Sequence, residues 1–449
     1  MNRSLNDDSI RDVVETLRRA NEQFSMNYPG ETGRRQPVHT VYGGAHLFKS
    51  DSAQKLGATA RRSLEEFAPD AATFAQALGL AEDLAEQVYQ RVTEKLQREP
   101  VEDFRIDFED GYGNRPDAEE DGHAASAAAE VAQGHKNKTL PPFLGIRIKP
   151  FNEELRARSI RTLDIFVTTL VEQNNGRLPD NFVITLPKIT IPEQVAALAA
   201  LLKQLEKQTR LAGGSLKFEM MIETTQSIIN HDGQLNLPLL LAAGEGRCVA
   251  AHFGTYDYTA GCNITAAHQH MLHPACDFAK SMMQVAFAGT GIWLSDGATN
   301  IMPVAPHRRA EGQSLRQQQV DENREVVHRA WKLHYDHIQH SLVNAFYQGW
   351  DLHPAQLPTR YAAVYAFFLG SLDAASERLK NFVDKAAKAT LVGDVFDDAA
   401  TGQGLLNYFL RAINCGAITE AEAVERSGLT LPELRSASFM KILKNRQAL

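Results

Sequence analysis

Short apolar runs alternate along most of this chain with longer stretches in which apolar residues recur at helical spacing. The apolar runs, which resemble buried strands, cover residues 37–42, 104–109, 143–149, 182–188, 216–223, 248–253, 291–295 and 345–350. Helical periodicity marks residues 117–132, 153–172, 192–210 and 316–341 between them. Strands that alternate with helices in this way predict an α/β fold, a (β/α)₈ TIM barrel. An open doubly wound sheet is the alternative, but no Gly-x-Gly-x-x-Gly turn follows the first strand.

Two flanking segments lie outside the eight units. We expect residues 1–36 to form an N-terminal helical arm, residues 37–386 the barrel, and residues 387–449 a C-terminal helical extension. An apolar stripe in the extension, Leu405, Leu406, Phe409 and Leu410, packs either on its own barrel or over a neighbouring subunit. The extension is therefore a predicted lid or oligomerisation segment, and we expect a homo-oligomer.

Charged residues alternate with apolar residues in the second predicted strand, Phe104-Arg-Ile-Asp-Phe-Glu. Period-two alternation places Arg105, Asp107 and Glu109 on one face of the strand. The outer face of a barrel strand packs on helices, so the charged face should point inward. Buried charges need partners or a metal. These residues therefore form either an ion-pair layer inside the barrel or part of a site.

Two acidic residues stand where predicted strands end: Glu223 in Met-Met-Ile-Glu-Thr-Thr and Asp257 in Gly-Thr-Tyr-Asp-Tyr. In a parallel barrel both would reach the face that carries active sites. Each acid alone is more often a helix cap or a surface charge. Together they indicate a site for Mg²⁺, which takes one or two carboxylates and completes its coordination with water and substrate oxygens.

Three further side chains near predicted strand ends carry candidate chemistry. Arg147 and Lys188 can balance the inward acids or hold a substrate carboxylate, and arginine is the better partner for a planar carboxylate. Lys188 can also form a Schiff base with a carbonyl, although a metal site nearby makes this unnecessary. His353 precedes a proline and is either a general acid or base or a loop histidine bonded to backbone.

Composition narrows the function classes. The net charge of −8 argues against nucleic acid as a partner. No apolar stretch approaches the roughly 20 residues of a membrane span, and the N-terminus lacks a signal-peptide pattern, so we expect a cytoplasmic protein without a membrane partner. Three cysteines fourteen residues apart and the histidines between them match no usual zinc spacing. The histidines of the segment 316–341 read as a polar helix surface.

These motifs resemble the citrate lyase β-subunit-like branch of the superfamily that also contains malate synthases and the HpcH/HpaI aldolases. The similar segments occur in the family's order: Asp107-Phe-Glu-Asp, Gly145-Ile-Arg-Ile, Leu186-Pro-Lys, Ile222-Glu-Thr, Gly254-Thr-Tyr-Asp-Tyr, Gly349-Trp-Asp-Leu-His-Pro-Ala-Gln and Gly393-Asp-Val-Phe-Asp. They span about 300 residues, and the Gly254 segment is nearest to the malate synthase form. The N-terminal arm and a long insertion between the first two strands depart from the family's usual barrel.

The resemblance implies a TIM barrel with Mg²⁺, or alternatively Mn²⁺, on Glu223 and Asp257. It implies a substrate site at Arg147, Glu109, Asp110, Gly254 and Thr255, and catalytic roles at Arg147, Lys188, His353 and Asp397. Asp397 would move the proton, from its own or an adjacent subunit.

The implied reaction is the making or breaking of a carbon–carbon bond beside a carbonyl, in an oxo-acid or an acyl-CoA. A Mg²⁺-dependent lyase is the main hypothesis. A malate synthase-type condensing transferase that uses a CoA thioester and a non-catalytic metabolite-binding barrel are the alternatives.

Overall fold

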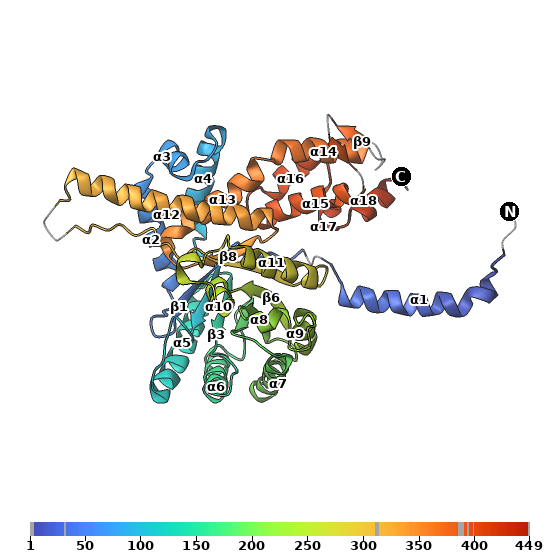
Figure 1. Ribbon diagram of the computed structural model, residues 1–449, viewed down its shortest axis with the longest axis horizontal. Coiled ribbons are helices and arrows are strands. Elements are labelled where there is room, and N and C mark those ends of the chain that lie inside the picture. The colour runs from blue at the N-terminus through green and yellow to red at the C-terminus, as the bar shows by residue number, and fades with distance from the viewer. Residues whose placement is uncertain are drawn as a thin grey trace.

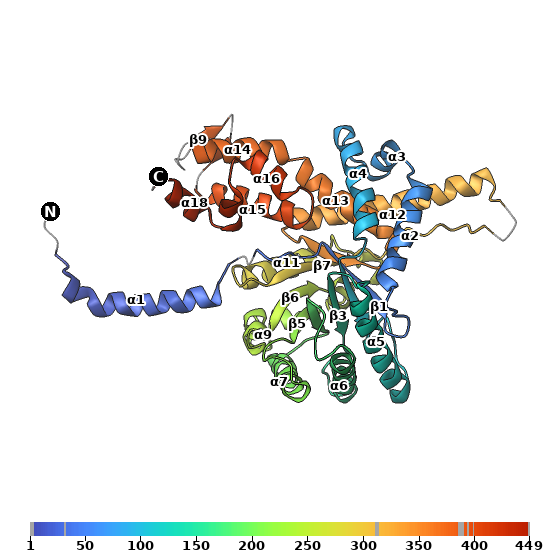
Figure 2. The ribbon, with the colours of Figure 1, turned by 180° about the vertical axis from the view of Figure 1, so that it is seen from behind.

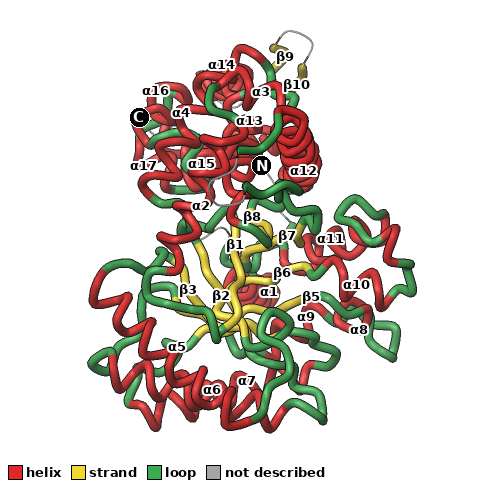
Figure 3. Tube along the Cα trace, turned by 90° about the vertical axis from the view of Figure 1, so that its left-hand side faces the viewer, coloured by secondary structure: helices red, strands yellow, loops and turns green. Residues whose placement is uncertain are grey.

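The computed structural model describes residues 4–30, 33–309, 314–384, 390–392, 395–397 and 399–447. Its centre is a closed barrel of parallel strands in sequential order (Figure 3). The strands are β1 (His39–Gly44), β2 (Asp103–Asp107), β3 (Phe143–Arg147), β4 (Phe182–Leu186), β5 (Lys217–Ile222), β6 (Cys248–Phe253), β7 (Trp293–Ala298) and β8 (Gln348–Asp351). Because β1 pairs with β8, the barrel closes and none of the strands β1–β8 has an open edge. The predicted TIM barrel is confirmed.

Helices connect successive strands and cover the outside of the barrel (Figures 1 and 2). They are α5 (Asp117–Asn137), α6 (Arg156–Gln173), α7 (Pro192–Thr209), α8 (Thr225–Ile228), α9 (Leu237–Ala243), α10 (Thr255–Gly261), η1 (Ala266–His268), α11 (Pro274–Phe287), α12 (Gln317–Val343), η2 (Pro354–Gln356) and α13 (Leu357–Leu369). Outward strand residues such as Phe104, Ile106 and Ile146 are buried beneath this layer. In the part of the chain that the structure describes, no helix is long and apolar enough to cross a membrane.

Three additions extend the barrel. The insertion after β1 forms α2 (Ser52–Phe67), α3 (Ala71–Leu78) and α4 (Glu82–Arg98). The C-terminal part contains α14 (Leu372–Asp384), a hairpin of β9 (Thr390–Val392) and β10 (Val395–Asp397), and α15 (Ala399–Asn414), α16 (Glu420–Ser427), α17 (Leu431–Arg435) and α18 (Phe439–Gln447). Helix α1 (Asp7–Asn27) projects away from this body, with Val13, Leu17 and Phe24 more than half exposed (Figures 1 and 2).

The charged face of β2 points into the barrel, as the alternation predicts. Arg105 reaches across to Glu219 on β5, a strand that is not its neighbour, and Nε and Nη2 each lie 2.7 Å from a carboxylate oxygen. Arg105 also pairs with Asp103 on its own strand. The structural ion-pair alternative is therefore correct for Arg105, because its guanidinium is buried among protein carboxylates.

A second buried ion cluster fastens the insertion to the barrel. Glu102, at the start of β2, accepts the backbone N–H of Val38 at 2.8 Å and lies 2.6 Å from the ammonium of Lys95 on α4. Arg35 lies 2.9 Å from the same carboxylate. Burial alone would raise the pKa of Glu102, but the charges of Lys95 and Arg35 lower it to about 2.

We expect this cluster to set the acid stability of the fold. The folded pKa of Glu102 lies below its unfolded value, so its contribution is present above about pH 4.3 and is lost as the pH falls toward 2, by roughly 3 kcal/mol. Glu102→Gln should lower the thermal unfolding midpoint at pH 7 and flatten its decline toward pH 3, as measured by circular dichroism. Glu94→Gln, a change at an exposed position of α4 next to Lys95, should behave as wild type. If the unfolding midpoints of both variants changed with pH in the same way, the Glu102 cluster would not set the acid stability of the fold.

Candidate metal and substrate site

Glu223 and Asp257 come from consecutive β-α units and line the same cavity at the carboxyl ends of the strands. Glu223 directly follows β5, where Thr224 caps α8 by accepting the N–H of Ser227 at 3.1 Å and so ends the strand. Asp257 lies in the first turn of α10 after β6, where the helix dipole favours an acid. Their shared cavity has a volume of about 320 Å³.

Glu223 is the more deeply buried of the two acids, at 2% exposure. One carboxylate oxygen accepts the backbone N–H of Lys188 at 2.7 Å. Burial and the neighbouring charge of Asp257 raise the pKa of Glu223 to about 8, because its charge lacks enough compensation. Gly254 makes room for this side chain, since a Cβ there would lie 2.5 Å from the Glu223 carboxylate.

The ammonium of Lys188 lies among the remaining acids of the site. It contacts Glu109 and lies 3.1 Å from Asp110 and 3.7 Å from Asp257. Its backbone φ is 50°, in the left-handed region that a lysine seldom adopts and that costs of order 1 kcal/mol or more. This conformation lets one residue give its N–H to Glu223 and its charge to three other carboxylates.

Arg147 at the end of β3 is completely buried and already paired. Its Nε donates to Asp107 at 2.7 Å, and Nη1 lies 3.1 Å from Glu109. Its guanidinium carbon lies 4.8 Å from the ring centre of Tyr42 and 5.4 Å from that of Trp350. Asp107 also accepts the backbone N–H groups of Glu109 and Gly111, and so orders the loop after β2.

The four acids around Lys188 fit a hard divalent cation. Glu109, Asp110, Glu223 and Asp257 outnumber the adjacent cations Lys188 and Arg147, and a carboxylate with a raised pKa gains most from an added positive charge. In the described parts of the chain no three His, Cys, Asp or Glu side chains are arranged as a complete metal site. A Mg²⁺ ion here would take Glu223 and Asp257 as ligands and use water or substrate for its other positions.

Other predicted site residues lie elsewhere or outside the description. His353 caps η2, with Nδ1 accepting the N–H of Ala355 at 3.1 Å, and among the described contacts no hydrogen bond or ion pair joins it to the acids. Thr255 is buried, and its hydroxyl makes no hydrogen bond. Asp397 ends β10, but its side chain lies outside the described residues.

Sequence reasoning missed some neighbours of the site and misplaced two histidines. Tyr42 and Trp350, which flank Arg147, read only as strand residues, and Asn152, which lines the cavity, gave no signal. The prediction that the histidines of α12 form a polar surface is wrong for two of them. His334 and His337 are buried because other segments supply hydrogen-bond partners, both through Thr299 at 2.9 Å.

The raised pKa of Glu223 predicts an unusual dependence of stability on pH in the presence of a chelator. The pKa of Glu223 in the folded protein, about 8, exceeds its value in the unfolded chain. The contribution of Glu223 to the free energy of unfolding is therefore complete below about pH 4, and it falls by roughly 3 kcal/mol or more as the pH rises to 8. Glu223→Gln should therefore gain thermal stability relative to wild type between pH 5 and pH 9. If the thermal stabilities of Glu223→Gln and wild type changed with pH in parallel, the charge of Glu223 would be compensated in the folded protein.

Comparisons with known proteins agree with the architecture. Similar solved structures include a citrate lyase from Burkholderia xenovorans LB400 (17% identity, 87% of this chain and 95% of that chain, TM-score 0.56). A structure of CitE from Mycobacterium tuberculosis with magnesium, acetoacetate and coenzyme A is 13% identical. The match covers 86% of this chain and 99% of that chain, with a TM-score of 0.48. A structure of Haloferax volcanii malate synthase with pyruvate and acetyl-CoA is 12% identical. The match covers 90% of this chain and 98% of that chain, with a TM-score of 0.45.

At 17% identity, the likeness to the Burkholderia protein supports the fold alone. No curated protein sequence matches significantly. The model of the family described as domain of unknown function DUF6986 matches residues 17–442. Because this match spans nearly the whole chain, the protein belongs to the DUF6986 family.

Proposed function

We propose that this protein is a Mg²⁺-dependent carbon–carbon lyase that acts on a small oxo-acid or an acyl-CoA. The buried, undercompensated carboxylate of Glu223 beside Asp257 is the observation that carries the proposal. A structural ion pair would not leave such a group short of positive charge. The position at the carboxyl ends of the strands is where TIM barrels carry their active sites.

The site offers groups for each part of this chemistry. When bound, Mg²⁺ would lower the cost of negative charge on a substrate carbonyl oxygen. Lys188 would turn from the acids toward a substrate carboxylate once the cation takes its place beside them. Arg147, fixed by Asp107 and two aromatic rings, presents its remaining edge toward Glu109. Glu109 and Asp110 would hold waters of the cation shell.

Proton transfer is assigned to two residues on the basis of the family resemblance. Asp397 would take or return the proton beside the carbonyl, with the segment 387–449 acting as a lid of its own or an adjacent subunit. General acid–base help of this kind typically contributes about 10²–10⁴-fold in rate. His353 would contribute only by leaving its capping position, because Nδ1 already accepts a backbone N–H.

A second candidate is condensation of an acyl-CoA with an oxo-acid, as in malate synthases. The segment from Gly254 to Tyr258 favours it, because this start of α10 keeps Asp257 in the first turn and matches the malate synthase form most closely. A binding barrel without catalysis is the third, and it is disfavoured by the unpaired acid charge.

Metal binding is the first test. Calorimetric titration with Mg²⁺ should show one ion per chain for wild type, and Glu223→Ala and Asp257→Ala should each weaken binding at least about tenfold, or roughly 1.4 kcal/mol. Asp232→Ala removes an exposed acid and is the matched control. Circular dichroism should show all variants folded. Undiminished binding in both site variants would refute the metal assignment.

Chemistry is tested separately. With Mg²⁺ present, exchange of the protons beside the carbonyl of pyruvate or oxaloacetate into D₂O, followed by NMR, should be fast for wild type. Asp397→Asn should slow it about 10²-fold or more, because Asp397 is the residue assigned to move this proton. Release of free thiol from acetyl-CoA and glyoxylate would favour condensation instead. Metal binding without exchange or thiol release would leave the binding barrel as the explanation.

A further inference from the structure

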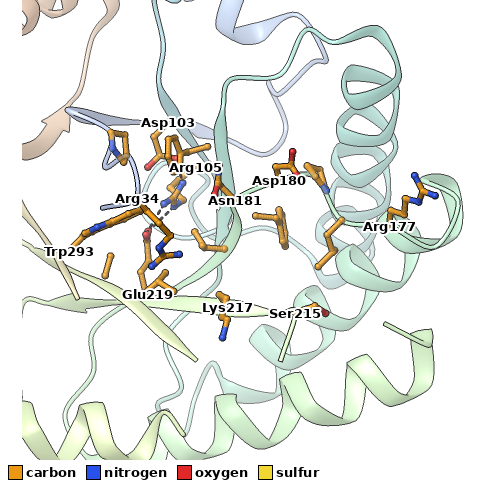
Figure 4. Close-up of a pocket in the computed structure, with 18 of the residues that line it drawn as sticks. Arg34, Asp103, Arg105, Arg177, Asp180, Asn181, Ser215, Lys217, Glu219 and Trp293 are labelled. Atoms are coloured by element: carbon orange, nitrogen blue, oxygen red, sulfur yellow. Dashed lines mark hydrogen bonds and ion pairs between the residues drawn. The ribbon is translucent and has the colours of Figure 1, made fainter. Parts of the chain in front are cut away.

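A second cavity opens at the opposite end of the barrel, among the amino-terminal ends of the strands. Its volume is about 540 Å³, within the range of small-molecule sites. Figure 4 shows it between Trp293 with Arg34 on one side and the loop around Asp180 on the other.

The floor of this cavity is a buried cluster of charged side chains. Arg105 pairs with Asp103 and with Glu219, and Thr40 donates to Asp103 at 2.8 Å (Figure 4). Each carboxylate thus has a protein partner and does not call for an external cation. His252, at 4% exposure, adds a ring nitrogen 3.2 Å from Glu219 that makes no well-directed hydrogen bond.

The walls combine a flat apolar surface with positive charge. Trp293 lies edge-to-face with Phe143, and the guanidinium carbon of Arg34 lies 5.0 Å from the Trp293 ring centre. Lys217 lines the cavity with only a 3.3 Å contact to a backbone carbonyl among its described hydrogen bonds. The remaining wall is mostly apolar and includes Pro37, Leu178, Pro179, Val183, Leu211 and Val249.

Charge at the rim favours an anion. The rim of the cavity carries Arg34, Arg177 and Lys217 and a single carboxylate, Asp180, although the whole chain carries a net charge of −8. Ser215 adds a hydroxyl without a hydrogen-bond partner. Among the charged side chains of the rim, cations therefore outnumber acids. A ligand with a flat apolar body and one anionic group would match both the apolar wall and the positively charged rim.

We propose that this amino-terminal cavity is a second ligand site, which binds a small organic anion with an aromatic ring. The ring would lie against the Trp293 wall and the anionic group would meet Lys217 and the neighbouring cations. The site is distinct from the acid cluster at the other mouth. The anionic group is either a carboxylate, as in an aromatic acid, or a phosphate, as in a nucleotide.

Benzoate and adenosine monophosphate are suitable probes of these two chemistries. Calorimetry on the full chain should show one saturable site for at least one probe, with Kd at about the millimolar level or tighter. Lys217→Glu should weaken this binding at least about tenfold. Lys203→Glu makes the same charge change on the exposed face of α7 and should bind as wild type. Preference for one probe identifies the anionic group.

Tryptophan fluorescence locates the probe, because Trp293 lies at this cavity and Trp350 lies beside Arg147. Quenching by the probe should disappear in Trp293→Phe and persist in Trp350→Phe. Binding should also persist in Glu223→Gln, whatever that variant does to metal binding, so failure here is separable from failure of the proposed function. Absence of saturable binding for both probes, or quenching lost only in Trp350→Phe, would overturn the proposal.

Discussion

Buried ion pairs between side chains of different strands line the inside of this barrel. TIM barrels usually fill this space with branched apolar residues. Here Arg105 crosses the interior to Glu219, and one layer higher Arg147 pairs with Asp107. Removing one member would leave an uncompensated buried charge, which typically costs about 3–5 kcal/mol. The pairs hold the strand ends in register, and both mouths of the barrel are built on them.

The carboxyl-end mouth differs from this paired interior by its excess of acid. Asp107 is satisfied by Arg147 and two backbone N–H groups, whereas Glu223 shares one strained lysine with three other carboxylates. The left-handed backbone of Lys188 is tolerated because the surrounding structure fixes it. The paired charges inside the barrel stabilise the fold. The excess of acidic side chains at the carboxyl-end mouth is suited to chemistry.

The sequence was sufficient to predict the barrel because buried parallel strands read as apolar runs. It placed β7 too early, at 291–295 rather than Trp293–Ala298, because Asp296, which is buried against Lys280 and Ser341 of the surrounding helices, looks like a loop residue. The strand-end rule placed Glu223 and Asp257, and the alternation in β2 placed Glu109, at the mouth where the structure has these side chains, because these positions depend only on local pattern. The burial of His334 and the aromatic neighbours of Arg147 depend on contacts distant in sequence, and no local pattern encodes them.

Every second residue of the β2 segment is charged, and these residues serve both ends of the barrel. Asp103 and Arg105 lie at the amino-terminal mouth, and Asp107 and Glu109 lie at the carboxyl-end mouth. Inserting or deleting one residue within β2 would turn the charged set onto the surrounding helices and the apolar set into the interior. A change in the length of β2 would therefore disrupt both mouths, whereas point substitutions along it keep the register.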